Sequence, residues 1–91
     1  MKSLREFELI VRAADAGSLS AAARQLDLTP AAASAALKRI EAEIGTPIFV
    51  RSTRSLRTTP AGDIFLRHCR EGLQHIGTAF DEIRTKSERI Q

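Results

Sequence analysis

One stretch of the chain, residues 29–45, restricts the possible folds more than any other because both of its ends carry helix-limiting residues. Thr29 is a favourable N-cap, and Pro30 suits the first helical position, where its missing N–H has no helical partner to lose. Gly45 is suited to ending a helix in the left-handed conformation, and Pro47 cannot continue it. We therefore predict that a helix fills this stretch.

The two sides of the predicted helix differ in chemistry. Its apolar stripe, with spacings of four, three and four, consists of Ala33, Leu37, Ile40 and Ile44. The opposite side, with Ser34 on its flank, carries Ala31, Ala35, Lys38 and Arg39. Small side chains followed by two cations suit a helix that lies close against a negatively charged surface. The alternative is an alanine-rich helix that faces solvent.

A first helix is predicted near the start of the chain. Ser3 and Glu6 fit a capping box, which begins a helix over about residues 4–15, and Gly17 ends it. Its apolar stripe consists of Leu4, Phe7, Val11 and Ala14. We expect this stripe to cover that of the helix described above.

A second helix follows after either Ser18 or Ser20, and a three-residue break at 27–29 separates it from the helix that Pro30 begins. Its predicted buried residues are Leu19, Ala22 and Leu26. Two helices joined in this way match the helix-turn-helix pattern, whose second helix enters the major groove of DNA. The break lacks the frequent glycine, and the same geometry also occurs as plain structural packing.

After Pro47 the sequence predicts a β-hairpin. Residues 48–50 form its first strand, residues 56–58 its second strand, and residues 52–55 the tip between them. Three arginines are spaced by three with no acid among them, namely Arg51, Arg54 and Arg57. Their guanidinium groups suit phosphates or a narrow minor groove, so we interpret the hairpin as the wing of a winged helix. A solvated hairpin with solubilising arginines is the alternative.

The positive charge of the chain is concentrated around this hairpin. The formal net charge is +3, and residues 38–60 hold five basic side chains against two acidic ones, whereas residues 61–91 hold five of each. The local excess favours a polyanionic partner. A single cysteine excludes an internal disulfide framework. The sequence shows no long apolar run and no signal-peptide core, which favours a cytoplasmic protein.

The last predicted helix follows the N-cap Thr59 and extends for about 28 residues from Pro60. Its apolar positions alternate spacings of three and four, as in a coiled coil, and are Leu66, Cys69, Leu73, Ile76, Phe80 and Ile83. A helix of roughly 40 Å is longer than this small core covers. We therefore expect dimerisation with the same helix of a second copy. Folding of the helix back onto its own domain is the alternative.

A set of positions at fixed spacing carries a family resemblance. The set consists of Ala22-Ala23, Leu26, Thr29-Pro30, Ser34, Ile40-Glu41, Gly45, Phe49, Arg51, Arg54, Thr59 and Ala61-Gly62. With these residues the chain resembles the N-terminal domain of LysR-type transcriptional regulators over residues 1–62, and the helix beyond resembles the family's linker helix. The resemblance implies a mainly α fold: a winged helix-turn-helix domain over residues 1–59, with a three-helix core and a two-stranded wing, and a linker helix over residues 60–91 for dimerisation. The two linker helices of a dimer would pack antiparallel.

The same resemblance implies sequence-specific binding of double-stranded DNA at a promoter or operator, by a homodimeric transcription factor on an inverted repeat. The residues expected to take part are Ser18, Ser20, Thr29, Pro30, Ala31, Ser34, Ala35, Lys38, Arg39, Arg51, Arg54 and Arg57. Many relatives have Gln at position 30 and Arg or Lys at position 35. Pro30 and Ala35 therefore leave more of the specificity to thymine methyl groups or DNA shape. Members of the family continue into a two-lobed effector-binding domain that this chain does not resemble, so a small-molecule effector is expected only through a domain not present here.

The sequence does not indicate an enzyme, a metal site or a cofactor. His68 and His75 lie roughly 10 Å apart on one helix, too far to share one ion within the chain. Cys69 occupies one of the regularly spaced apolar positions of the last helix, which is typical of a packed residue. Asp81-Glu82 lie among helix-surface charges. No glycine-rich phosphate loop and no catalytic triad is present in the sequence. The competing functional interpretation is a winged-helix protein-interaction module whose coiled-coil seam binds a different protein.

Overall fold

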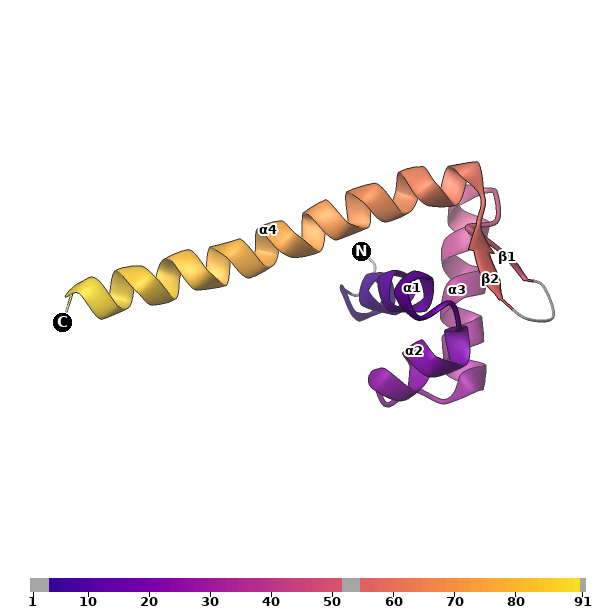
Figure 1. The fold of residues 1–91 in the computed structure, drawn as a ribbon, viewed down its shortest axis with the longest axis horizontal. Coiled ribbons are helices and arrows are strands. Elements are labelled where there is room, and N and C mark those ends of the chain that lie inside the picture. The colour runs from indigo at the N-terminus through magenta and orange to yellow at the C-terminus, as the bar shows by residue number, and fades with distance from the viewer. Residues whose placement is uncertain (1–3, 52–54, 91) are drawn as a thin grey trace.

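The computed structural model describes residues 4–51 and 55–90, apart from the side chains of residues 51 and 88–90. Its elements follow in the order α1 (Leu4–Ala16), α2 (Leu19–Gln25), α3 (Pro30–Ile44), β1 (Phe49–Arg51), β2 (Leu56–Thr58) and α4 (Pro60–Ile90). Three helices and the hairpin gather at one end of the molecule, and α4 extends away from them (Figure 1). The molecule therefore measures 54 × 25 × 24 Å. The mainly α fold with a two-stranded wing is confirmed.

The predicted ends of α3 are confirmed by its caps. The hydroxyl of Thr29 accepts a hydrogen bond from the N–H of Ala32 at 3.1 Å. At the other end Gly45 adopts a φ of +90°, and its N–H donates to the carbonyl of Glu41 at 2.8 Å. The left-handed conformation of this residue ends the helix and turns the chain toward the hairpin.

Helix α2 begins after Ser18 and not after Ser20. The Ser18 hydroxyl accepts from the N–H of Ala21 at 3.1 Å, as an N-cap does. The turn that follows α2 needs one residue with positive φ, and Asp27 supplies it at +55°. Asp tolerates this conformation better than most residues, which explains how the turn forms without a glycine. In addition, Arg5 of α1 donates a hydrogen bond to the carbonyl of Leu26, which ties α1 to the turn.

The core lies where α1, α2 and α3 meet, and it includes residues at the start of the hairpin and in the second turn of α4. Its buried members are Leu9, Ile10, Ala13, Ala22, Ala23, Ala33, Ala36, Leu37, Ile40, Ile48, Phe49 and Leu66. Many of them are alanines, whose small side chains let neighbouring helices approach closely. One expectation about α3 was wrong, because Ile44 is 40% exposed. Ala36, which was not placed in the predicted apolar stripe, is buried as well. Ile44 ends the helix, and no following turn of the helix covers it.

Helix α1 also buries more than its predicted stripe. Leu9 and Ile10 are fully buried, whereas Leu4 is 46% exposed. The reason is that α1 packs against α2 and α3 on one side and against α4 on another. Sequence periodicity predicted a single apolar stripe, whereas a helix that packs against neighbours on two sides needs two apolar stripes. The predicted capping role of Ser3 lies outside the described residues.

The hairpin is antiparallel, with Phe49 opposite Thr58 and Arg51 opposite Leu56. Its first strand begins one residue later than predicted. The N–H of Ile48 donates instead to the carboxylate of Glu41 at 2.7 Å, and that of Phe49 approaches the same oxygen at 3.4 Å. Glu41 thus connects α3 to the start of the wing. Of the predicted tip, residues 52–55, only Ser55 is described, and residues 52–54 lie outside the described residues.

Helix α4 is fixed at its start to the turn that precedes β1. Thr59 donates from its N–H to the carbonyl of Ile48 at 2.9 Å and from its hydroxyl to the carbonyl of Pro47 at 2.7 Å, and the hydroxyl accepts from the N–H of Gly62 at 2.9 Å. A Cβ atom on Gly62 would lie 2.1 Å from the Ile48 carbonyl oxygen, so only glycine fits this approach. From there α4 continues for 31 residues, slightly longer than expected.

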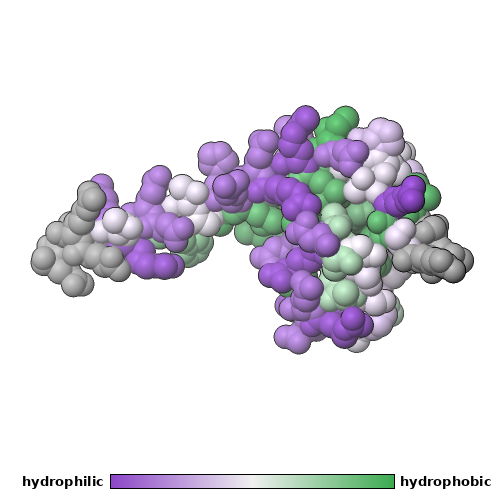
Figure 2. All heavy atoms as spheres, in the orientation of Figure 1, coloured by the Kyte–Doolittle hydropathy of each residue, from purple (hydrophilic) through white to green (hydrophobic). Residues whose placement is uncertain are grey.

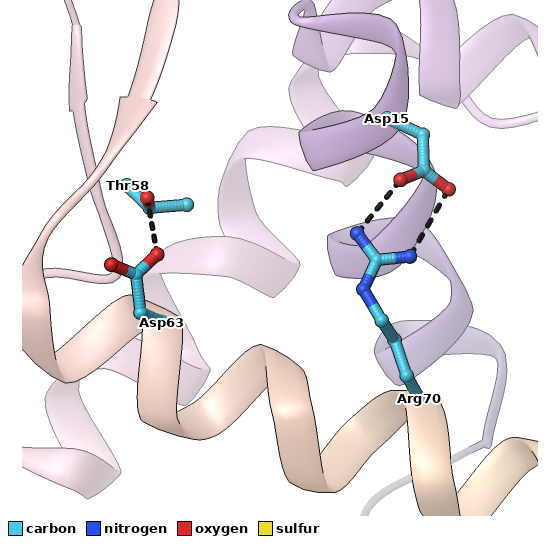
Figure 3. A network of polar contacts seen from close by, with 4 residues as sticks. All are labelled: Asp15, Thr58, Asp63 and Arg70. Atoms are coloured by element: carbon cyan, nitrogen blue, oxygen red, sulfur yellow. Dashed lines mark hydrogen bonds and ion pairs between the residues drawn. The ribbon is translucent and has the colours of Figure 1, made fainter.

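Two polar contacts brace α4 against the rest of the fold (Figure 3). Near its start, the Thr58 hydroxyl donates to the carboxylate of Asp63 at 2.5 Å. Further along, Arg70 forms an ion pair with Asp15 near the end of α1, with a shortest distance of 2.7 Å. The direction in which α4 leaves the domain is therefore defined by contacts at two separate places.

Candidate nucleic-acid interface

The N-terminal half of α3 presents short side chains at the surface. Ala31 and Ala35 are exposed, and Ser34 between them is half-buried. The surface over this helix is mostly pale in Figure 2, which means that it is neither strongly hydrophilic nor strongly hydrophobic. Short side chains leave the helix backbone close to the surface, so another macromolecule can approach it closely.

The start of α3 is also electrostatically suited to an anion. Thr29 caps the helix with its oxygen, and its hydroxyl hydrogen is still available as a donor. Pro30 occupies the first helical position. The first turn of a helix carries partial positive charge, which favours phosphate groups near it.

The predicted basic residues differ in what they contact. Lys38 is exposed on α3 and Arg57 is exposed on β2, where it lies opposite Val50. Arg39 forms an ion pair with Glu6 of α1, with Nη2 2.6 Å from Oε1. The Arg39 side chain is 57% exposed and that of Glu6 only 17%, so the pair fastens α3 to α1 at the edge of the core. The Arg51 side chain and Arg54 lie outside the described residues.

The two serines before α3 occupy different positions. Ser18 is half-buried and its oxygen caps α2, while Ser20 is exposed in the first turn of α2. The structure thus brings Ser20 and the exposed side of α3 to the surface in one helix-turn-helix unit, with the hairpin beside α3 (Figure 1).

Sequence reasoning predicted Thr59 as an N-cap but did not predict that Glu41, Thr59 and Gly62 position the base of the wing. Glu41 holds the backbone at the base of the wing, and Thr59 with Gly62 fixes the same turn from the side of α4. The sequence offered no distinctive signal for two of them, because Glu41 is one of several charged residues on its helix and Gly62 is one of three glycines in α4.

The remaining candidates for chemistry do not form a site in the described part of the chain. His68 and His75 are both exposed, and residues 4–51 and 55–90 contain no group of three His, Cys, Asp or Glu residues that could hold a metal ion. Cys69 is half-buried, and burial raises the pKa of its thiol, so the thiol stays protonated near neutral pH. None of the helices described here is long and apolar enough to cross a membrane.

Three helices, a helix-turn-helix unit with an exposed second helix and an adjoining two-stranded wing define the winged helix-turn-helix class of proteins. Within that class, residues 4–63 match the profile of the family described as bacterial regulatory helix-turn-helix protein, lysR family. The match covers more than half of the chain, and the chain belongs to this family.

Individual relatives agree with this assignment. The chain is 39% identical over 88 residues to the uncharacterized HTH-type transcriptional regulator y4mQ of Sinorhizobium fredii, a match that covers 97% of the chain and 27% of that protein. It is 38% identical to the probable HTH-type transcriptional regulator LtrA of Klebsiella pneumoniae, covering 97% of the chain and 28% of that protein. The chain therefore spans about a quarter of the length of these curated relatives.

A solved structure shows the same arrangement of elements. The crystal structure of a CbnR DBD–DNA complex superposes with a TM-score of 0.82 at 28% sequence identity, covering 94% of this chain and 99% of that one. This similarity extends over nearly the whole chain, so it includes α4 as well as the winged part.

Proposed function

We propose that this chain binds double-stranded DNA at a promoter or operator, as the DNA-binding part of a bacterial transcriptional regulator. The observation that carries the proposal is the exposed N-terminal half of α3, where small side chains and a helix start lie beside a basic hairpin. The CbnR DBD, which has this fold, is a domain that was crystallised with DNA.

In this proposal α3 is the recognition helix and lies in the major groove. Ser34 offers a hydroxyl that both donates and accepts, and Ala31 and Ala35 offer methyl groups that fit thymine methyls. We assign the remaining residues either to contacts with the phosphate backbone or to the edge of the interface. They are Ser18, Ser20, Thr29, Pro30, Lys38, Arg39, Arg51, Arg54 and Arg57. Few direct hydrogen bonds to base edges are then available, and DNA shape carries more of the specificity.

We further propose that two copies act together, with residues 1–59 of each contacting DNA and residues 60–91 forming the dimer. Ile76, Phe80 and Ile83 are exposed on α4 at 38%, 66% and 67%, which a soluble helix rarely tolerates without a partner. A two-fold dimer would place its recognition helices in successive major grooves of an inverted repeat. This function requires binding and no catalysis, and its DNA target implies a cytoplasmic location.

A fluorescence titration with duplex DNA at several salt concentrations tests the proposal. The duplex is first obtained by selection from a random pool, which should yield an inverted repeat. Each phosphate contact releases counterions, so we expect affinity to fall steeply with salt. The competing protein-interaction module predicts no salt-sensitive DNA binding.

Two substitutions separate positioning from base recognition in the same titration. Arg57→Ala is expected to weaken binding to every sequence and to reduce the salt slope by about one. Arg12→Ala removes the same charge from α1, outside the proposed interface, and serves as the matched control with an unchanged slope. Ser34→Ala should instead change the preference at one or two base pairs; uniform weakening across a site library would remove Ser34 from the base-reading role.

A further inference from the structure

We propose that the ion pair between Asp15 and Arg70 fixes the angle between the winged domain and α4, and that this angle determines which spacing between two half-sites a dimer of this chain binds. A half-site is one half of the inverted repeat. The inference rests on the recognition helix and the dimer of the proposed function. It goes beyond them because it assigns a role in DNA specificity to two positioning residues on α1 and α4, away from the exposed start of α3.

Helix α1 is fastened firmly to the recognition helix α3. Leu9 and Ile10 of α1 are fully buried, in the same core as Leu37 of α3. At the edge of that core, Arg39 of α3 lies 2.6 Å from the carboxylate of Glu6 on α1. The two helices therefore move together, and any group held by α1 is also held relative to the recognition helix.

The joint between α1 and α4 is less tightly packed. Leu66 of α4 is buried, but no residue from position 67 to position 87 is. Beside Arg70 the angle between the two helices opens into a cleft of about 700 Å³, whose lining includes Asp15 of α1 and Ile76 and Gly77 of α4. Side-chain packing therefore leaves room for α4 to swing relative to α1.

The ion pair bridges this joint. Two nitrogens of the Arg70 guanidinium face the two carboxylate oxygens of Asp15, at 2.7 and 3.4 Å (Figure 3). A forked contact of this kind restricts orientation as well as distance. It is the last polar contact that the described residues of α4 make with the winged domain. It lies roughly 12 Å along the helix from Gly62, where α4 is fixed to the turn before β1.

A small rotation at the joint is enlarged at the start of the recognition helix. Helices α3 and α4 diverge from a shared corner, and α3 runs away from it for 15 residues, which is roughly 20 Å (Figure 1). A displacement of about 2 Å at Arg70, with an arm of about 12 Å, turns α4 by about 10° and moves the start of α3 by about 3.5 Å. Neighbouring base pairs lie about 3.4 Å apart along DNA. Each copy would therefore shift by about one base pair.

The expected effect on specificity has an upper limit. The side chains of Arg70 and Asp15 are 46% and 58% exposed, and the interaction free energy of such a pair is small. A contact can shift an equilibrium only by as much as its own interaction free energy. Loss of the pair should therefore reduce the preference for the correct spacing by up to about fivefold in each copy, and by up to about 25-fold in a dimer.

Titration of a series of duplexes tests the inference. The half-site found by selection is placed in inverted repeats whose spacers differ by one or two base pairs, and also in a duplex with a single half-site. Asp15→Asn and Arg70→Gln should each lower the ratio of affinities between the best spacing and the next by about three- to 25-fold. Binding to the single half-site should stay within about twofold of wild type, since neither residue belongs to the proposed DNA interface. A role in folding alone would not change the ratio between spacings.

Two further variants serve as controls. Asp15→Arg combined with Arg70→Asp exchanges the charges, restores attraction across the joint, and should restore the spacing preference. Arg84→Gln removes the same charge from an ion pair with Asp81 that lies within α4, and should leave the preference unchanged. The inference is overturned by an unchanged ratio in Asp15→Asn and Arg70→Gln, or by equal weakening at every spacing. A folded charge-exchange variant without the restored preference would overturn it as well.

A distance measurement examines the joint without DNA. In a Cys69→Ala background, nitroxide labels are attached to Arg24→Cys on α2 and Thr78→Cys on α4, both at exposed positions. Dilution with unlabelled protein limits the measured distances to those within one chain. With the ion pair intact the distance distribution should be narrow, with Asp15→Asn it should broaden or shift by several ångströms, and the charge exchange should reverse that change. Identical distributions with and without the pair would contradict the inference.

The same titrations separate this inference from the proposed function. A wild-type chain that binds DNA in a salt-sensitive way but equally well at all spacings contradicts the inference alone. So does a spacing preference that survives loss of the ion pair. A wild-type chain that does not bind DNA contradicts the proposed function, and the inference with it.

Discussion

The guanidinium group of Arg70 lies against the carboxylate of Asp15, with Nη2 2.7 Å from Oδ1 and Nη1 3.4 Å from Oδ2 (Figure 3). The two residues are 55 positions apart in sequence, and their contact joins the first half of α4 to the last turn of α1. Hydrogen bonding to Arg70 holds the pKa of Asp15 below its usual value. The pair therefore contributes stability only while Asp15 is ionised.

Asp15→Asn should destabilise the fold at neutral pH by less than about 1 kcal/mol, because both side chains are exposed to solvent. Since the folded-state pKa is lowered, this contribution is fully present above the unfolded value of about 3.9 and is lost as the pH falls through the lower folded value. Urea unfolding of wild type and variant should therefore differ at pH 7 and converge toward pH 2.5. Glu71→Gln, on the exposed side of α4, is the control. A difference that persisted unchanged at low pH would show that the pair is not the cause.

Gly62→Ala should destabilise the fold by about 1–3 kcal/mol or more, as overpacking does. The added Cβ would lie 2.1 Å from the Ile48 carbonyl oxygen, which is backbone and cannot rotate away. Gly72→Ala in the same helix meets nothing within 4 Å and should be neutral or stabilising by up to about 1 kcal/mol. Thermal or urea unfolding of the two variants checks this, and equal effects would argue against the close approach at Gly62.

Glu41→Ala should reduce the free energy of unfolding by about 1–3 kcal/mol, because the half-buried N–H of Ile48 loses its charged acceptor. Hydrogen exchange should also become faster at Ile48 and Phe49 than elsewhere in the core. Glu71→Ala removes a carboxylate of the same size from the exposed side of α4 and should do neither. Unchanged exchange at Ile48 would mean that Glu41 does not hold the base of the wing.

Lys38 and Arg39 are adjacent cations whose substitutions should have different effects. Lys38→Ala is expected to lower the salt slope of DNA binding by about one with little change in stability. Arg39→Ala loses the 2.6 Å ion pair with Glu6, so it should lower stability, by up to about 1 kcal/mol, and change the slope less. Salt-dependent titrations together with unfolding curves measure both quantities. The reverse pattern would assign the phosphate contact to Arg39.

The sequence predicted the helix boundaries wherever a single residue type determines the backbone. Thr29 with Pro30 at the start of α3 and Gly45 at its end are such cases, because caps act within one turn of the helix. The wing strands were also predicted to within one residue. The start of β1 was missed because a side chain seven residues earlier, Glu41, takes the N–H of Ile48.

Features that depend on long-range packing were predicted less well. Periodicity gave α1 one apolar stripe, whereas burial of Leu9 and Ile10 follows from its position between other helices. The burial of Ala36 was not predicted and the burial of Ile44 was overestimated, because the periodicity of one helix does not indicate where the helix that covers it ends. Likewise the ion pair that engages Arg39 joins residues 33 positions apart, and its partner Glu6 was predicted only as a capping residue.

Chemical-shift mapping with a duplex selected from a random pool tests the central proposal most directly. We predict that backbone amide shifts change at the exposed start of α3, around Ser34, and along the hairpin, around Arg57. The distant half of α4 should respond little to DNA. Shifts confined to α4 or to the outer side of α1, with Ser34 and Arg57 unmoved, would contradict the account.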